Sequence, residues 1–405
     1  MAKKTRNHVD DLRGASRLVI DATERVTEVV EAMHTTIAGG PAILGKPLAG
    51  PARFINGLIY GGIRGVTRLV GTSIERALAP LAPLLGESAA APGERPEREA
   101  VLAVLNGVLG DYLAETKNPL AIAMRLRHDS HPLELDTQAL RAALPDANGR
   151  LLILLHGSSM NDLQWCRHGH DHGAALARDL GYTPLYLHYN SGLHVSSNGR
   201  ELDALLDRLV AAWPAPVDEL VLLGHSMGGL VARSACEYGE GHAWRSKLTK
   251  LICLGTPHHG AALERGGNWI DVLLGVSRYS APLARLGKLR SAGVTDLRFG
   301  NVLDKHWEGR DRFAHAGDPR DELKLPEGVA CYAIAGTTSP EGCSNPVGDG
   351  LVSVDSALGR HDASHLTLAF PEGRRWIGYG IGHLDLLSRP EVYEKVRSWL
   401  SPAAR

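Results

Sequence analysis

The fold is decided by the stretch Leu220–Gly229, which reads LVLLGHSMGG. Four apolar residues lead into the pattern G-x-S-x-G at 224–228, and the helix-like run LVARSACEYG follows. A serine on a sharp turn between a buried strand and a helix presents its hydroxyl to a substrate. Gly224 and Gly228 remove side chains that would collide with so tight a turn. This context predicts that Ser226 is a nucleophile.

The residues around this turn alternate between strand-like and helix-like runs from about residue 148 onward. This alternation is typical of a mostly parallel sheet covered by helices on both faces. Helices are predicted near 170–180, 199–212, 228–238 and 391–400. Strands are predicted at 151–155, 183–188, 220–223, 251–254, 329–335 and 366–370. The predicted fold class is therefore α/β.

A serine hydroxyl is a weak nucleophile at neutral pH, so Ser226 needs a base, an acid and donors for the developing oxyanion. One donor is expected to be the backbone N–H of Met227, at the start of the helix that follows. The run LLILL leads directly into His156-Gly157-Ser158. The N–H of Ser158 is the second predicted donor, and Gly157 lets the chain turn towards the site. His156 precedes the nucleophile in the chain, so we expect it to orient this loop.

The acid is expected in a loop after a late strand. Asp349 lies between two glycines, on a turn that could reach a histidine sideways. Asp355 is the competing candidate, but it follows an apolar valine and suits the start of a short helix. The sequence therefore favours Asp349.

The base is expected after the last strand and before the final helix, because the triad of this class runs in the order Ser, Asp or Glu, His. His383 occupies this place in the run GIGHLD. His361 and His365 come too early, and His258 follows the strand after the elbow, where it could line the pocket. His383 is therefore the predicted base, held in the correct tautomer by Asp349.

About 70 residues separate the run TPHHG at 256–260 from the next predicted strand. So long a connection predicts a cap or lid insertion at about 261–328. Its apolar clusters favour hydrophobic ester substrates. Trp165, after the loop with Ser158, could form a further pocket wall or lie in the core. The predicted catalytic domain spans residues 131–405.

Residues 1–130 are predicted to form a helical region with a linker near 86–97 (GESAAAPGERPE). Three helices are expected, within 19–37, at 54–85 and at 98–114, with a further one around 119–127. Two interpretations stay open for this region. It could pack on the catalytic domain or on a second copy, or its glycine-rich amphipathic segment could contact a membrane surface or a partner.

Composition excludes several classes of function. Lys plus Arg (44) nearly cancels Asp plus Glu (45), so no net charge favours nucleic acid. The N-terminus lacks the apolar core of a secretory signal, and no apolar run suits a membrane span. The five cysteines lack a metal-like spacing, although Cys331 and Cys343 could pair. A cytoplasmic protein without a metal or another cofactor is predicted.

The segments LLHGSSMND, GHSMGGLVAR, LGTPHHGA, GDGLVSVDSA and GHLDLL resemble the lipase and esterase branch of the α/β-hydrolase superfamily, including bacterial triacylglycerol lipases and the lipase-like domain of GPI inositol-deacylases. The resemblance covers about 150–400 and implies the same acid and base, Asp349 and His383. In such lipases the Asp after the base helps to bind calcium, whereas here Asp385 suits a hydrogen-bonding role near the last helix.

The resemblance implies a serine carboxylesterase or lipase that acts on hydrophobic acyl esters through an acyl-enzyme. An acyltransferase or thioesterase could use the same triad, because the acyl-enzyme is common to all three. A docking protein with a vestigial hydrolase domain is the remaining alternative, and the intact Ser226, Asp349 and His383 weigh against it.

Overall fold

The computed structural model describes residues 96–261, 291–310, 318, 320–321 and 324–402. The chain divides into two units, and apart from Glu115–Leu120 all of these residues belong to the second, Ala90–Ala114 with Ala121–Arg405. The description below concerns that unit. Most of the predicted N-terminal region and residues 262–290 of the predicted insertion lie outside the described residues.

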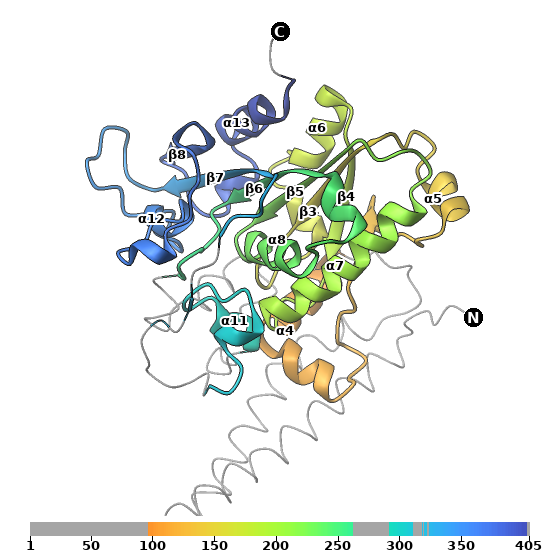
Figure 1. Cartoon of the computed structure of the whole chain (residues 1–405), viewed down its shortest axis with the longest axis horizontal. Coiled ribbons are helices and arrows are strands. Elements are labelled where there is room, and N and C mark those ends of the chain that lie inside the picture. Colours follow the sequence, from red (N-terminus) through yellow and green to blue (C-terminus); the bar gives the residue numbers. More distant parts are fainter. Residues whose placement is uncertain (1–95, 262–290, 311–317, 319, 322–323, 403–405) are drawn as a thin grey trace, which may run out of the picture. The chain divides into compact units, whose positions relative to one another are not determined.

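Within the described part of the chain, one sheet has the order β2-β1-β4-β3-β5-β6-β7-β8 (Figure 1). The strands β3 to β8 all run parallel, while β1 is antiparallel to both of its neighbours. The predicted α/β class is therefore confirmed. The strands are β1 (Arg125–His128), β2 (His131–Pro132), β3 (Arg150–Leu155), β4 (Thr183–His188), β5 (Glu219–His225), β6 (Leu248–Leu254), β7 (Ala330–Thr337) and β8 (Arg375–Tyr379).

The central strands are continuous apolar runs because helices cover both of their faces. The residues of β3, for example, are all buried from Leu151 to Leu155. On one face, Leu152, Leu154 and their counterparts on β5, β6 and β7 form a core with α6 and α13. The helices α7 and α8 lie on the other face (Figure 1). The helices are α4 (Pro96–Glu115), α5 (Thr137–Ala143), α6 (His172–Leu180), α7 (Val195–Ala212), α8 (Met227–Tyr238), α11 (Ala292–Asp296), α12 (Val354–Ala357) and α13 (Pro390–Leu400).

The chain reverses its direction of travel across the sheet at β3. The strand β4 is added on one side of β3, whereas β5 is added on the other. In open parallel sheets, ligands bind in the crevice at the carboxyl ends of the strands on either side of such a switch point. The loops that follow β3 and β5 are those that contain Gly157 and Ser226.

Two sequence predictions are wrong. Residues 125–128, expected within a helix, form β1, because Leu126 is buried opposite Leu187 of β4 in an antiparallel pair. Residues 366–370, expected as the last strand, do not join the sheet. Leu366, Leu368 and Phe370 are buried, and the residues between them are exposed, so the alternation reflects burial of one side of the segment without strand pairing. The strand that pairs with β7 at this side of the sheet is β8.

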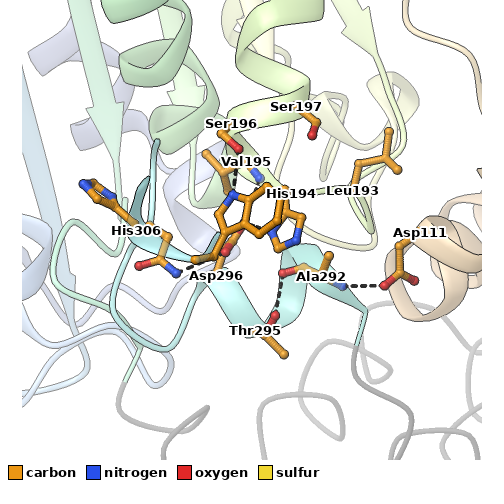
Figure 2. A network of polar contacts seen from close by, with 12 residues as sticks. Asp111, Leu193, His194, Val195, Ser196, Ser197, Ala292, Thr295, Asp296 and His306 are labelled. Carbon is orange, nitrogen blue, oxygen red and sulfur yellow. Dashed lines mark hydrogen bonds and ion pairs between the residues drawn. The ribbon is translucent and has the colours of Figure 1, made fainter. Parts of the chain in front are cut away.

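The segment 291–310, within the predicted insertion, is bound to the rest of the sheet unit. The Asp296 carboxylate accepts hydrogen bonds from Val195 N and His194 Nδ1, both at 2.9 Å, at the start of α7 (Figure 2). The Ala261 N–H donates to Leu297 O over 2.9 Å. The first residue of the predicted insertion is therefore joined to a residue in its later part.

Candidate active site

Ser226 is the single residue between β5, which ends at His225, and α8, which begins at Met227. Its backbone has φ 55° and ψ −124°. A positive φ is strained for a side chain with a Cβ and persists only where the surroundings enforce it. The enforcing contacts include a hydrogen bond from Ser226 N to Leu254 O at 2.8 Å. The sequence therefore forms the strained turn that its glycines predict.

The glycines on either side of Ser226 are required by space. A Cβ on Gly224 would lie 2.5 Å from the backbone N of Gly229. A Cβ on Gly228 would lie 2.3 Å from Leu155 O at the end of β3. Because these contacts are to backbone atoms, no side-chain movement could relieve them. Any larger residue would displace the start of α8.

The loop after β3 lies against the nucleophile. A Cβ on Gly157 would lie 3.1 Å from both Ser226 Cβ and His225 Nδ1. Ser158 is buried directly after Gly157, and its N–H donates to no group in the described part of the chain. The N–H of Met227, the first residue of α8, has no carbonyl within the helix to bond. Both predicted oxyanion donors therefore lie next to the nucleophile.

His383 and Asp349 are joined by a hydrogen bond of 2.7 Å between Nδ1 and Oδ2, and both side chains are almost fully buried. Because a carboxylate only accepts, Nδ1 carries the proton, and in neutral His383 the lone pair stands on Nε2. The other oxygen of Asp349 accepts from Leu351 N at 3.0 Å and Val352 N at 2.8 Å. Asp349 is thus fixed by its own turn.

The end of β6 connects the nucleophile with this pair. Leu254 O accepts from Ser226 N, and a Cβ on the next residue, Gly255, would lie 3.2 Å from His383 Cε1. The same Cβ would lie 3.0 Å from Asp349 Oδ2. Ser226, Asp349 and His383 therefore lie close together, at the carboxyl ends of the strands. Asp355, the competing acid, is exposed and pairs with Arg360 instead.

His225, which the sequence analysis did not single out, contacts the backbone of the predicted base. Its Nε2–H donates to His383 O over 3.1 Å, so the residue before the predicted nucleophile holds the backbone of the predicted base. Burial, together with the nearby His383, keeps the pKa of His225 well below its usual value, so the ring is neutral. The signal available in the sequence was a histidine at the end of an otherwise apolar strand.

His156 braces the loop after β3. Its Nδ1–H donates to Gly157 O over 2.8 Å, and its ring stacks on Tyr189 at a centroid distance of 4.2 Å. Burial lowers the pKa of His156 to about 3, so the ring is uncharged at neutral pH. The Tyr189 hydroxyl in turn donates to His156 O over 2.8 Å.

The remaining predicted pocket residues lie elsewhere. Trp165 belongs to the hydrophobic core, edge-on to His225 at 6.4 Å. His258 packs beside Arg233 of α8, whose Nη1 lies 3.1 Å from His258 Nδ1. Asp385 Oδ2 accepts from Gly382 N over 3.1 Å, close to the predicted base.

Among the residues that the structure describes, no three His, Cys, Asp or Glu side chains form a metal-binding group. All five cysteines, Cys331 and Cys343 included, have free thiols.

Helix α4 packs against the loops around the candidate site. The sequence analysis did not predict this contact. A Cβ on Gly107 would lie 2.0 Å from Ser159 Oγ, beside the predicted oxyanion loop. The Asn190 side chain, after β4, donates to Gly110 O over 2.8 Å. The spacing of Gly107 and Gly110 in an apolar helix is the signal for this close approach.

A buried charged network joins α4 to the same loop. Arg127 Nη1 of β1 donates to Glu99 Oε2 at 3.1 Å and to Asp162 Oδ1 at 3.0 Å. His188 Nδ1 lies 3.1 Å from Asp162 Oδ1. Burial alone would raise the pKa of Asp162, but the hydrogen bond from His188 and the charge of Arg127 lower it. Asp162 is therefore a carboxylate that anchors the loop after β3.

A pocket of about 230 Å³ lies beside the predicted acid and base. It is lined by Asp349, Gly350, Leu351, Gly382, His383, Leu384 and Asp385. Among the described helices, none combines the length and the hydropathy that a membrane span requires.

The strand order, the nucleophile turn and the buried Asp–His pair define the class of protein: this is an α/β-hydrolase fold. Residues 146–313 match the family model described as the PGAP1-like alpha/beta domain. The superfamily predicted from the sequence motifs is thereby confirmed.

Several solved structures are similar at low sequence identity. The mature lipase BlEst2 of Bacillus licheniformis shares 16% identity over 69% of this chain and 98% of its own, with a TM-score of 0.42. The esterase Pf2001 of Pyrococcus furiosus shares 14% over 63% of this chain and 83% of its own, with a TM-score of 0.39. EstA of Clostridium botulinum shares 13% identity over 63% of this chain and 87% of its own, with a TM-score of 0.38. No curated protein sequence matches this chain.

Proposed function

We propose that this chain is a serine-dependent carboxylic-ester hydrolase that acts on hydrophobic acyl esters. Ser226 is the nucleophile, His383 the general base, and Asp349 the group that orients the base. The observation that carries the proposal is the buried bond of 2.7 Å between His383 Nδ1 and Asp349 Oδ2, at the sheet edge that holds the strained Ser226. That bond leaves Nε2 as the basic atom of a neutral imidazole.

The reaction proceeds in two halves. His383 Nε2 takes the proton of Ser226 Oγ as this oxygen attacks the ester carbonyl, and the N–H groups of Met227 and Ser158 bind the oxyanion. The ester C–O bond then breaks, and the imidazolium gives its proton to the departing alcohol. Water, deprotonated by the same nitrogen, cleaves the acyl-enzyme, and the carboxylic acid leaves while Ser226 recovers its proton.

Several features support these roles. The strain at Ser226 is maintained by hydrogen bonds and close backbone contacts, as at functional sites generally. Each oxyanion donor typically contributes about 3 kcal/mol to stabilising the transition state. The preference for a hydrophobic acyl group rests on the apolar clusters of the predicted insertion, outside the described residues. The cytoplasmic location and the membrane or self-association role of the N-terminal region stay predictions.

The test is hydrolysis of p-nitrophenyl esters from acetate to palmitate by the full chain and by Ser226→Ala. We expect ester cleavage by the wild type, a preference for longer chains, and a loss of about 10⁶-fold in kcat in the variant. Ser364→Ala, at an exposed position, is the matched control. Folded wild-type protein that cleaves no ester, or a fully active Ser226→Ala, would overturn the proposal.

A single-turnover experiment separates hydrolysis from acyl transfer. With an added alcohol or thiol acceptor, a hydrolase still releases the free acid as its main product. Exclusive formation of a new ester or thioester would assign the same triad to an acyltransferase.

A further inference from the structure

Ser159, the residue after the predicted oxyanion donor Ser158, has a left-handed backbone conformation with a φ of 58°. This conformation is uncommon for a residue with a side chain, and it persists only where the surroundings offset its cost. Ser159 is buried, and a Cβ on Gly107 of α4 would lie 2.0 Å from its Oγ. Backbone strain is therefore stored directly beside the group that is expected to bind the oxyanion.

A hydrogen bond from the loop after β4 helps to hold this conformation. Ser159 N donates to Ser191 Oγ over 2.9 Å, and both residues are buried. If this acceptor were lost, the buried N–H would be left unsatisfied, and the loop would turn to find it another partner. Such a turn moves the peptide that joins Ser158 to Ser159, so Ser158 would move with it.

Ser158 has donors that no described group uses. It is buried, its hydroxyl has no hydrogen-bond partner in the described part of the chain, and its backbone N–H donates to none there. The loop is nonetheless fixed on both sides of Ser158. His156 O accepts from the Tyr189 hydroxyl over 2.8 Å, and Ser159 N donates to Ser191. Both contacts come from the segment 189–191, which therefore fixes the place of Ser158.

Ser191 is itself fixed by close backbone contacts. A Cβ on Gly293 of α11 would lie 2.1 Å from Ser191 O, and Gly293 N donates to Gly192 O over 3.0 Å. The start of α11 is joined in turn to α4, because Ala292 N donates to Asp111 Oδ2 over 2.9 Å (Figure 2). The hydroxyl that holds Ser159 therefore lies on a segment with little freedom to move.

We infer that Ser191 is a positioning residue for ester hydrolysis: its hydroxyl keeps Ser159 in the left-handed conformation and thereby aims the N–H of Ser158 at the oxyanion. The inference rests on the proposed function, because it takes Ser158 as an oxyanion donor. Ser191 acts through Ser158 and needs no contact with the substrate. Its effect falls on the transition state, since the carbonyl oxygen gains its negative charge only as Ser226 attacks.

Ser191→Ala in the full chain tests the role of the hydroxyl. It should lower kcat by about 10- to 100-fold and change KM by less than about 2-fold, because a displaced donor weakens transition-state binding alone. A trifluoromethyl ketone forms a tetrahedral adduct with a serine nucleophile, so its affinity should fall by the same factor as kcat/KM. Ser234→Ala is the matched control. The buried Ser234 hydroxyl donates to Val302 O over 2.6 Å, and its loss should lower stability but not kcat.

Ser191→Cys fills the same space with a weaker acceptor, so it should show the same kind of loss to a smaller degree. This variant keeps the test valid even if Ser191→Ala does not fold.

Ser159→Gly separates positioning from a general loosening of the loop. Glycine adopts a positive φ without strain, so adding Ser159→Gly to Ser191→Ala or Ser191→Cys should restore kcat by about 3- to 10-fold. If Ser191 served stability alone, a second truncation in the same loop would lower activity further.

Wild-type kcat in both Ser191 variants, or a double variant no faster than its Ser191 parent, would overturn the inference while leaving the proposed function intact. Wild-type protein that cleaves no ester, or a fully active Ser226→Ala, would overturn the proposed function and this inference with it.

Discussion

His383 donates from Nδ1 to Asp349 Oδ2 over 2.7 Å, and its own backbone N–H donates to Asp349 O over 2.9 Å. Two bonds thus join residues that lie far apart in the sequence, one to the carboxylate and one to the main chain. The main-chain bond survives any change of the Asp349 side chain. The role of the carboxylate can therefore be tested with the loop still in place.

Asp349→Asn should lower kcat by about 10⁴-fold, because an amide that donates to Nδ1 turns the imidazole into the wrong tautomer. Ester hydrolysis measured with saturating substrate checks this. Asp355→Asn is the matched control, since Asp355 is exposed and paired with Arg360. A large loss in Asp355→Asn with none in Asp349→Asn would reverse the assignment of the acid.

His225→Ala should lower kcat by about 10- to 100-fold with little change in KM, because His383 O loses its donor and the base loses its support. His225→Gln should recover most of this loss, since its amide N–H can replace Nε2–H. Steady-state kinetics of both variants, with circular dichroism to confirm folding, decides the matter. Equal losses in the two variants would show that the hydrogen bond is not what matters.

Gly224→Ala should destabilise the fold by about 1–3 kcal/mol or more, because its Cβ would lie 2.5 Å from the backbone N of Gly229. Gly157→Ala meets Ser226 Cβ at 3.1 Å and should impair activity more than stability. Gly373→Ala, with open space around it, should change neither property. Urea unfolding and ester hydrolysis, measured together on all three variants, test this ordering.

The stability of the fold should decline as the pH falls from about 6.5 to 4. Burial lowers the pKa of His172 to about 4, whereas in the unfolded chain it is about 6.5. Between these values the unfolded state binds the extra proton, so this residue alone reduces the free energy of unfolding by up to about 1.4 kcal/mol per pH unit. His172→Gln should show a shallower pH dependence of that free energy between pH 7 and 5. The control His365→Gln, at an exposed position, should show the same pH dependence as the wild type. Identical slopes in all three proteins would refute this linkage.

Arg127→Met should destabilise the protein by about 3–5 kcal/mol, because it leaves the buried carboxylates of Glu99 and Asp162 without their cation. The double variant Arg127→Met with Asp162→Asn should recover part of this loss, since one unpaired charge is removed. Urea unfolding of the single and double variants checks the coupling. Additive losses would mean that the network is not cooperative.

The sequence predicted the parts of the molecule whose signals are local. Strands such as LLILL and LVLL are fully buried runs, and the glycines around Ser226 specify a turn that only small residues can form. Asp349 and His383 could be proposed because the chain order of this fold limits where each can lie. Five of the six predicted strands, and all four helices predicted after residue 148, occur close to their predicted bounds.

The parts that depend on tertiary contacts could not be predicted. Leu366 to Phe370 alternates like a strand, but its buried face packs without a sheet partner. The short strand Arg125–His128 has a single fully buried apolar residue, and only its pairing with β4 makes it a strand. The hydrogen bond from His225 to His383 O joins residues 158 positions apart, and no local pattern indicates it.

Ala261, at the start of the predicted insertion, bonds Leu297 in its later part, and Asp296 fixes that later part to the start of α7 (Figure 2). A loop whose ends are already fixed costs little to lengthen, about 0.6 kcal/mol for each doubling of its length. Evolution can therefore change the length of the segment between Ala261 and Leu297 while it retains the residues of the candidate site. The same closure gives the protein engineer two natural junctions at which segments from other hydrolases can be grafted.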